Sequence, residues 1–202
     1  MQLMDRLAGT GLLEHQGHVD GAWVGSDQAR TYAVEDTATG AEINQIADMS
    51  GEETLRAIAA AEASWPAWRK KTAKQRDVIL RKWFELMMAH QRDLAIIVTA
   101  EQGKALAEAV GEIAYCVSFA EEAKDVCGDV IPHHQDGERI LVIKKPVGVV
   151  AEITPWHFPH AMIIRKCAPA LAAGCPVVIK PAPATPYWAL ALAELAERAV
   201  FP

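Results

Sequence analysis

The sequence predicts an α/β fold, in which an N-terminal arm and a group of helices precede the first β-α-β-α units of a doubly wound parallel sheet. Short apolar segments around Gly-containing turns fill residues 1–50, as in an arm of short strands. Helical periodicity then fills most of residues 51–126. After residue 138, short apolar runs alternate with helical patterns, which is the order that a parallel sheet requires.

The composition is that of a globular protein, and it argues against several classes of function. Of the 202 residues, 51% are hydrophobic and 23% are charged, which suffices for a packed core. The net charge of −6 and the short basic run Arg69–Lys71 argue against a nucleic-acid partner. No apolar stretch reaches the roughly 18 residues of a membrane span, and a secretory signal is not expected. The cysteines lack Cys-x-x-Cys spacing, so we expect free thiols in the cytoplasm.

The arm is expected to contain short strands joined by turns. Residues His18–Val24 surround a turn at Asp20-Gly21, and Thr31–Glu35 and Glu42–Ala47 predict two strands around Thr39-Gly40. Residues 1–50 are therefore expected to form one extended arm of short strands.

Two capping boxes predict the starts of the first two helices. Ser50 with Glu53, and Thr72 with Gln75, have the spacing at which each side chain satisfies the backbone of the other. Pro66 is expected to end or bend the first helix, because proline has no backbone N–H to donate.

Glycines predict the ends of the next two helices. A third helix is expected from about Asp93 to Glu101, with a stop at Gly103. A fourth is expected from Leu106 to about Val126, and Gly128 follows it.

The last part of the chain predicts alternating strands and helices. Arg139–Lys144 reads as a strand, and Val147–Ile153 reads as a strand buried on both faces because its apolar run is nearly unbroken. A helix over Pro159–Ala173, ended by Gly174, leads to a second buried strand at Val177–Ile179. Thr185–Val200 then predicts another helix.

Two segments are candidates for a binding site on position alone. Ligands of open α/β sheets bind beyond the carboxyl ends of the strands, and Thr154–Pro159 and Lys180–Pro186 follow the two buried strands. The first carries an aromatic ring and an imidazole, and the second carries a cation suited to a ribose hydroxyl or a phosphate. On pattern alone, both segments could equally be rigid, proline-rich connections.

The same two segments resemble the paired nucleotide-site motifs of the aldehyde dehydrogenase superfamily. They read Ile-Thr-Pro-Trp-His-Phe-Pro over residues 153–159 and Lys-Pro-Ala-Pro-Ala-Thr-Pro over residues 180–186, and Pro169–Cys175 between them matches as well. Further stretches are similar to the succinate-semialdehyde branch: Trp68-Arg69, Glu101–Lys104, Gly128-Asp129 and Ala189–Arg198. The resemblance covers essentially the whole chain and implies the N-terminal portion of an NAD(P)-dependent enzyme.

The resemblance implies a mechanism and a set of site residues. In the complete enzyme a cysteine thiolate attacks the aldehyde, hydride passes to the nicotinamide, and a glutamate helps water to hydrolyse the thioester. Lys180 is expected to contact the adenosine ribose. Arg165 is expected to meet the substrate carboxylate, although by position alone it reads as a surface arginine of a helix. The implied cofactor-binding residues for NAD or NADP are Ile153, Thr154, Pro155, Trp156, Lys180, Pro181, Ala182 and Pro183.

The resemblance also implies a domain organisation. Residues 1–50 form the arm, and residues 51–202 form a partial NAD(P)-binding domain, that is, an incomplete aldehyde dehydrogenase cofactor domain. Residues 139–145 are expected to serve as an oligomerisation strand, since unpaired strand edges invite pairing and family members associate through such strands. A homo-oligomer is therefore expected of the complete enzyme.

Two positions depart from the family pattern within these motifs. His157 stands where the family has the asparagine that holds the oxyanion, and a neutral imidazole offers a single N–H donor. A role for His157 as a catalytic base is the alternative. Pro183 stands where NAD-preferring relatives often have an acidic residue, so the choice between NAD and NADP stays open. A Gly-x-Gly-x-x-Gly phosphate loop is absent from the sequence.

Two hypotheses of function follow. The first is a fragment of an NAD(P)-dependent aldehyde dehydrogenase that oxidises a small aldehyde, succinate semialdehyde in particular, and is inactive alone because none of its cysteines matches the nucleophile. The second is a non-catalytic nucleotide-binding or assembly protein that pairs with an intact relative. A metal site at His133-His134, or at His15 and His18, is not expected, because neighbouring side chains of an extended chain point to opposite faces.

Overall fold

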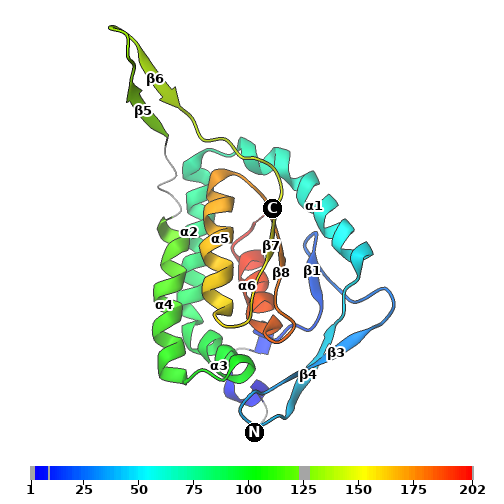
Figure 1. The fold of residues 1–202 in the computed structure, drawn as a ribbon. Helices are drawn as coiled ribbons and strands as arrows, with labels where there is room; N and C mark the ends of the chain where they lie inside the picture. Colours follow the sequence, from blue (N-terminus) through cyan, green and yellow to red (C-terminus); the bar gives the residue numbers. More distant parts are fainter. Residues whose placement is uncertain (1–2, 9, 123–127, 202) are drawn as a thin grey trace.

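The computed structural model describes residues 3–8, 10–122 and 128–201. Helices α2 to α6 form a bundle, α1 crosses one end of it, and a short parallel strand pair, β7–β8, lies between them (Figure 1). A second strand pair, β5–β6, extends away from the rest of the molecule. The predicted fold class is confirmed: strands and helices alternate in the last part of the chain, and β7 and β8 are parallel.

The N-terminal arm contains the strands that its turns predict. Two short 3₁₀ helices, η1 (Leu3–Arg6) and η2 (Thr10–Leu12), precede β1 (Gly17–Val19) and β2 (Ala22–Val24). The strands β3 (Thr31–Glu35) and β4 (Glu42–Ala47) then form an antiparallel pair with the predicted bounds. Both pairs are antiparallel hairpins, as the Gly-containing turns require.

The first two helices begin where the capping boxes predict. In α1 (Gly51–Lys70) and α2 (Ala73–Ala89), the N-cap and the third helical residue satisfy each other's backbone. Of the two effects predicted for Pro66, the end of α1 was wrong, because the helix continues to Lys70; a bend at Pro66 stays a prediction. Proline removes the hydrogen bond of its own backbone nitrogen, and the last turn beyond it is held by Trp68, whose indole Nε1 donates to Leu171 O at 3.0 Å.

Glycine ends the third helix as predicted. Helix α3 (Gln91–Gln102) stops at Gly103, whose φ of 82° lies in the left-handed region that glycine adopts without strain. A Cβ at this position would also meet Thr37 Oγ1 at 2.8 Å. Helix α4 (Leu106–Glu122) follows, and its predicted continuation to Val126 lies outside the described residues.

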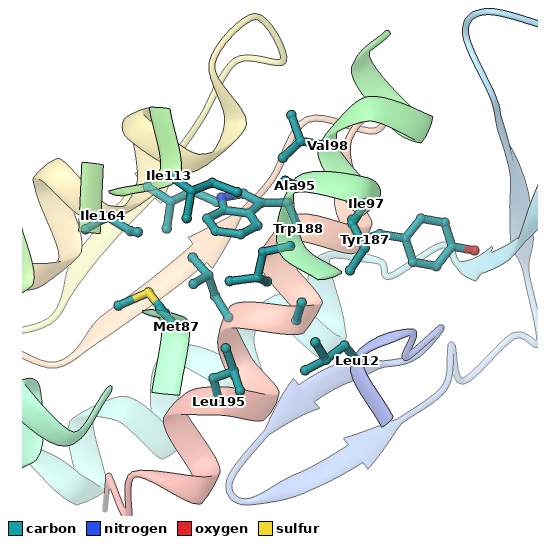
Figure 2. Packing of buried hydrophobic residues seen from close by; sticks show 14 of the residues in the cluster. Leu12, Met87, Ala95, Ile97, Val98, Ile113, Ile164, Tyr187, Trp188 and Leu195 are labelled. Atoms are coloured by element: carbon teal, nitrogen blue, oxygen red, sulfur yellow. The ribbon is translucent and has the colours of Figure 1, made fainter. Parts of the chain in front are cut away.

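The core of the molecule lies among the helices. Helix α5 (Pro159–Ala173) has the predicted bounds, with proline in its first turn and Gly174 after its last. Helix α6 (Pro186–Arg198) packs beside it, and its Trp188 is fully buried. Figure 2 shows the Trp188 indole near Ile113 of α4 and Ile164 of α5, while Tyr187 points in another direction. These contacts fix the first turn of α6 within the bundle.

Both strands of the parallel pair are more exposed than the sequence predicts; β7 is shorter than the predicted Val147–Ile153, and β8 extends one residue beyond the predicted Val177–Ile179. Strand β7 (Val150–Ile153) pairs with β8 (Val177–Lys180), starting at Val150 with Val177. The expectation of burial on both faces was wrong, because the Ile153 side chain is 76% exposed and β8 is only half-buried. Among the described residues each of these strands has one strand neighbour. Helix α5 packs against both strands and α1 contacts β8, while Ala151 and Ile153 of β7 stay exposed.

The second exposed pair contains a strand that the sequence did not predict. Strand β6 (Arg139–Val142) falls within the predicted segment Arg139–Lys144, and β5 (Asp129–Pro132) pairs with it in antiparallel fashion. All residues of both strands are exposed. None of the described helices is long and apolar enough to cross a membrane.

Candidate functional site

The parallel pair brings the two predicted site segments side by side. In the register of the pair, Ile153 lies opposite Lys180, so the last residue of one strand is next to the last residue of the other. Beyond them, the Thr154 N–H donates to Lys180 O at 3.2 Å. Both loops therefore leave the same edge of the sheet, which is the place where open α/β sheets bind ligands.

The side chains at this edge differ in exposure. Ile153 and Trp156 are 76% and 58% exposed, whereas Thr154 is buried. The Lys180 side chain is exposed, and its Nζ donates to Pro181 O at 3.2 Å. The edge thus offers an apolar surface, an aromatic ring and a cation to solvent, a combination that suits a nucleoside.

The loop after β8 is held by its own backbone and by the helix that follows. The Thr185 N–H donates to Ala182 O at 3.1 Å, and Pro186 begins α6. Ala182 is buried and Pro183 is exposed. Pro183 therefore lies on the outside of the loop. The Thr185–Ala182 hydrogen bond and the start of α6 fix the backbone of the loop.

A buried carboxylate from α3 holds the start of α6. The Glu101 side chain accepts the N–H of Tyr187 at 2.8 Å and the N–H of Trp188 at 3.0 Å. Thr185, the N-cap residue of α6, makes no side-chain capping bond, so Glu101 takes that role from a distant part of the chain. Burial raises the pKa of Glu101 to about 8, although both N–H donors favour the charged form.

The loop after β7 is held by the residues that follow Glu101. The Gln102 side-chain amide donates to His157 O at 3.2 Å. Lys104 Nζ lies 4.3 Å from the centroid of the Phe158 ring, a cation–π contact, and it also pairs with Glu112. The imidazole of His157 makes edge contacts with Trp156 and Phe158 and is exposed.

A buried histidine lies beneath the same loop. His160 is fully buried, and its Nε2 lies 3.0 Å from Glu112 Oε2. Its ring meets that of Trp188 edge-on, with 5.9 Å between centroids. Burial lowers the pKa of His160 and Lys104 adds to this effect, while Glu112 opposes it.

Arg165 lies on α5 rather than in either loop. Its side chain is exposed. The structure therefore sends the two segments that carry the predicted cofactor residues from one sheet edge, and it places Arg165, the predicted substrate residue, on the neighbouring helix.

Two described cysteines are buried and free. Cys167 and Cys175 are 1% and 4% exposed, and burial raises the pKa of the Cys167 thiol well above its usual value. A nucleophilic cysteine needs an accessible thiolate. These two thiols are therefore packing residues.

One buried carboxylate at the edge of the site has no hydrogen-bond partner among the described residues. The side chain of Glu152, in β7, is 3% exposed and faces α5. Burial raises its pKa to about 7, and Lys166 opposes this shift. Sequence reasoning missed Glu152 because a single glutamate in an apolar run carries no periodic signal.

Comparison with known proteins decides the family. The sequence pattern that defines the "Aldehyde dehydrogenase family" matches residues 23–202. The chain belongs to the aldehyde dehydrogenase family. The resemblance inferred from the two loops is thereby confirmed for the family.

Several of the similar relatives in this family are semialdehyde dehydrogenases. The chain is 57% identical to the glutarate-semialdehyde dehydrogenase of Pseudomonas aeruginosa over 100% of the chain and 42% of that protein. It is 52% identical to the NADP(+) succinate-semialdehyde dehydrogenase of Escherichia coli over 98% of the chain and 42% of that protein. The chain thus spans less than half the length of the curated relatives that it matches, which agrees with a partial cofactor domain.

Solved structures of family members share the fold. The crystal structure of succinate-semialdehyde dehydrogenase from Burkholderia pseudomallei has 54% identity and a TM-score of 0.90, over 97% of this chain and 42% of that one. A betaine aldehyde dehydrogenase from Staphylococcus aureus, in complex with NAD⁺, has 31% identity and a TM-score of 0.86 over 94% of this chain and 39% of that one. The arrangement of strands and loops described above is therefore that of aldehyde dehydrogenases.

Proposed function

We propose that this chain is the part of an NAD(P)-dependent semialdehyde dehydrogenase that carries one wall of the nucleotide cleft, and that it does not turn over substrate alone. The observation that carries the proposal is the register of β7 with β8. It sets Ile153 next to Lys180 and sends both motif loops from one sheet edge. We also expect the chain to work in the cytoplasm, where free thiols such as Cys167 and Cys175 stay reduced.

The residues at the sheet edge fit the adenosine part of a dinucleotide. The exposed Ile153 side chain gives the adenine ring an apolar surface, and Lys180 Nζ has hydrogens free to donate to ribose hydroxyls besides the one it directs to Pro181 O. Thr154 and Trp156 line the edge through main chain and ring. When bound, NAD(P)⁺ supplies the hydride acceptor. Pro183 offers no side-chain hydrogen bond, so it gives the ribose edge no preference for a 2′-hydroxyl or a 2′-phosphate.

The substrate that we propose is a small aldehyde with a carboxylate at its other end. The relatives named above act, by their names, on succinate or glutarate semialdehyde. Arg165 of α5 is the cation that we assign to the substrate carboxylate, because a guanidinium binds a carboxylate through two N–H donors. In the complete enzyme, oxidation passes through a thioester on a cysteine that is neither Cys167 nor Cys175.

His157 changes the oxyanion site of this proposed enzyme. Its backbone is held by Gln102, but the imidazole replaces a carboxamide that donates from a compact neutral group. Loss of one oxyanion donor lowers the rate by a factor of about 10² to 10³. We therefore expect weak catalysis even in the complete enzyme, which contains the nucleophilic cysteine.

Nucleotide binding by the purified chain tests this proposal. Titration calorimetry with NAD⁺ and with NADP⁺ should show binding that falls several-fold in Lys180→Ala, since one charge-assisted bond is worth about 1.5–3 kcal/mol and exposure reduces it. Lys74→Ala, which removes an exposed lysine from α2, is the matched control and should bind like the wild type. Equal affinity in the two variants would remove Lys180 from the site. Turnover of succinate semialdehyde by the chain alone would contradict the proposed inactivity.

The exposed hairpin favours a second candidate function, an assembly protein that pairs with an intact relative. Val130 and Leu141 lie opposite each other in β5–β6 and are 67% and 66% exposed. Apolar strands with open edges invite pairing with another chain. We propose that residues 139–145 form the oligomerisation strand.

Co-expression with an intact semialdehyde dehydrogenase tests the second candidate. The expected result is a complex that co-elutes in size-exclusion chromatography and is lost when Leu141→Arg and Val130→Arg place like charges opposite each other on the hairpin. Separate elution of the two wild-type proteins would contradict assembly while leaving nucleotide binding untouched.

A further inference from the structure

We propose that the segment Glu101–Lys104 is a positioning element, which fixes the loop after β7 and the loop after β8 relative to each other at the spacing that a dinucleotide needs. The inference rests on the proposed nucleotide cleft. Its basis is geometric: successive residues of one short segment contact the loop after β7 and the start of α6, directly after the loop that follows β8, although both partners lie far from the segment in sequence.

The loop after β8 is held through its C-terminal end. Glu101 accepts two backbone N–H groups from the first turn of α6, directly after the segment Lys180–Thr185. The carboxylate is 1% exposed, so water does not compete for these donors. Displacing Glu101 would release the helix start and, with it, the end of the loop that carries Lys180.

The loop after β7 is held at its middle. Gln102 donates to the carbonyl of His157, and the Lys104 ammonium sits over the Phe158 ring. Lys104 is fixed in turn by Glu112 of α4, and its side chain is 7% exposed. These two contacts from one segment therefore fix the position of the exposed residues Trp156–Phe158 relative to the sheet edge.

The segment itself is anchored to the arm. The Thr37 N–H donates to Ala100 O at 3.2 Å, and Gly103 turns the chain away from α3 in the left-handed conformation, close to the Thr37 side chain. These contacts hold the segment at its start and at Gly103, and a positioning element needs such a hold to keep the loops in a fixed geometry.

Gln102 separates a positioning role from a purely structural one. Gln102→Met keeps the length of the side chain and removes the amide donor without adding charge. Gln91→Met is the matched control, since the Gln91 amide donates to Val110 O at 2.7 Å and joins α3 to α4 on the opposite end of α3. A structural role predicts similar effects of the two variants. A positioning role predicts that only Gln102→Met changes the environment of Trp156 in the loop and the affinity for the nucleotide.

The experiment measures two quantities in the chain and both variants. One is the affinity for NAD⁺ and NADP⁺ by titration calorimetry. The other is the ¹⁹F signal of 5-fluorotryptophan at Trp156, assigned by its absence in Trp156→Phe. We expect Gln102→Met to shift the Trp156 signal and to weaken binding about two- to tenfold, the equivalent of one neutral hydrogen bond. Gln91→Met should change neither.

Each outcome decides one of the two proposals. If the wild type binds nucleotide and both variants match it, or both lose affinity equally, positioning by Gln102 is wrong while the proposed function stands. If the wild type binds neither nucleotide, the proposed cleft fails in this chain. The Trp156 signal then decides alone: a shift confined to Gln102→Met keeps the loop-positioning role, and an unchanged signal overturns it.

Discussion

The helical body, formed by α2 to α6, and the two open strand pairs, β5–β6 and β7–β8, place their apolar side chains in opposite environments. Leu94, Ile97 and Met87 of the body are fully buried, whereas Leu141 of β6 and Ile153 of β7 are 66% and 76% exposed. The helices bury their apolar faces against one another within this chain. Each described strand of the open pairs has a single neighbour: β5 and β6 are exposed throughout, and Ile153 of β7 faces solvent, while Val177 and Ile179 of β8 are half-buried against the core.

The candidate site lies where these two regions meet. Its strand ends belong to an open pair, while its loops are tied to the body through Glu101 and Gln102. A ligand at this edge can thus contact exposed side chains whose backbone is held by a packed core. This arrangement resembles that of many binding sites, in which loops are positioned by a rigid scaffold.

The largest difference between the two regions is expected in the free energy of unfolding, when one leucine in each region is replaced by alanine. Leu192 of α6 is 2% exposed and Leu141 of β6 is 66% exposed. Leu192→Ala should lower the free energy of unfolding by about 2–5 kcal/mol, because it leaves a cavity in the body. Leu141→Ala should change it by less than about 0.5 kcal/mol. Urea unfolding followed by circular dichroism measures both, and equal losses would mean that the hairpin is part of the cooperative core.

Local signals made much of the body predictable. The bounds of α5 follow from proline in its first turn and Gly174 after its last, and the starts of α1 and α2 follow from their capping boxes. These features act within one or two turns of the chain, so the sequence alone contains them. Strands β3 and β4 were predicted for the same reason, through the turn that joins them.

Long-range contacts explain what could not be predicted. Strand β5 has only two apolar residues followed by Pro132, and it becomes a strand by pairing with β6. The exposure of β7 depends on what covers the sheet, which its own residues do not encode. For the site, the strand-end rule located both loops. The bonds from Glu101 to α6 join residues 86 and 87 positions apart, and no local pattern indicates them.

A smaller effect is expected from the buried carboxylate of β7, at the boundary between the two regions. Burial raises the pKa of Glu152 from its ordinary value of 4.5 to about 7. The folded chain therefore holds this proton more tightly than the unfolded chain does. The resulting stabilisation is fully present below pH 4.5 and is lost as the pH rises through about 7. Between about pH 5 and 8 we expect a loss of about 2 kcal/mol, less than the whole shift would give because part of the range between the two pKa values lies below pH 5.

Other groups, such as Glu101, titrate in the same range, so the contribution of Glu152 to the pH dependence of stability must be isolated. The variants Glu152→Gln and Glu62→Gln do this. The first removes the buried carboxyl of β7, and the second removes an exposed carboxyl of α1. Urea midpoints measured across the pH range should fall less steeply in Glu152→Gln than in the wild type. Glu62→Gln should follow the wild type at every pH. If the urea midpoint of Glu152→Gln fell with pH as steeply as that of the wild type, water would reach this carboxyl in the folded chain. The solvent-accessible region would then include the α5 side of β7 as well as its exposed face.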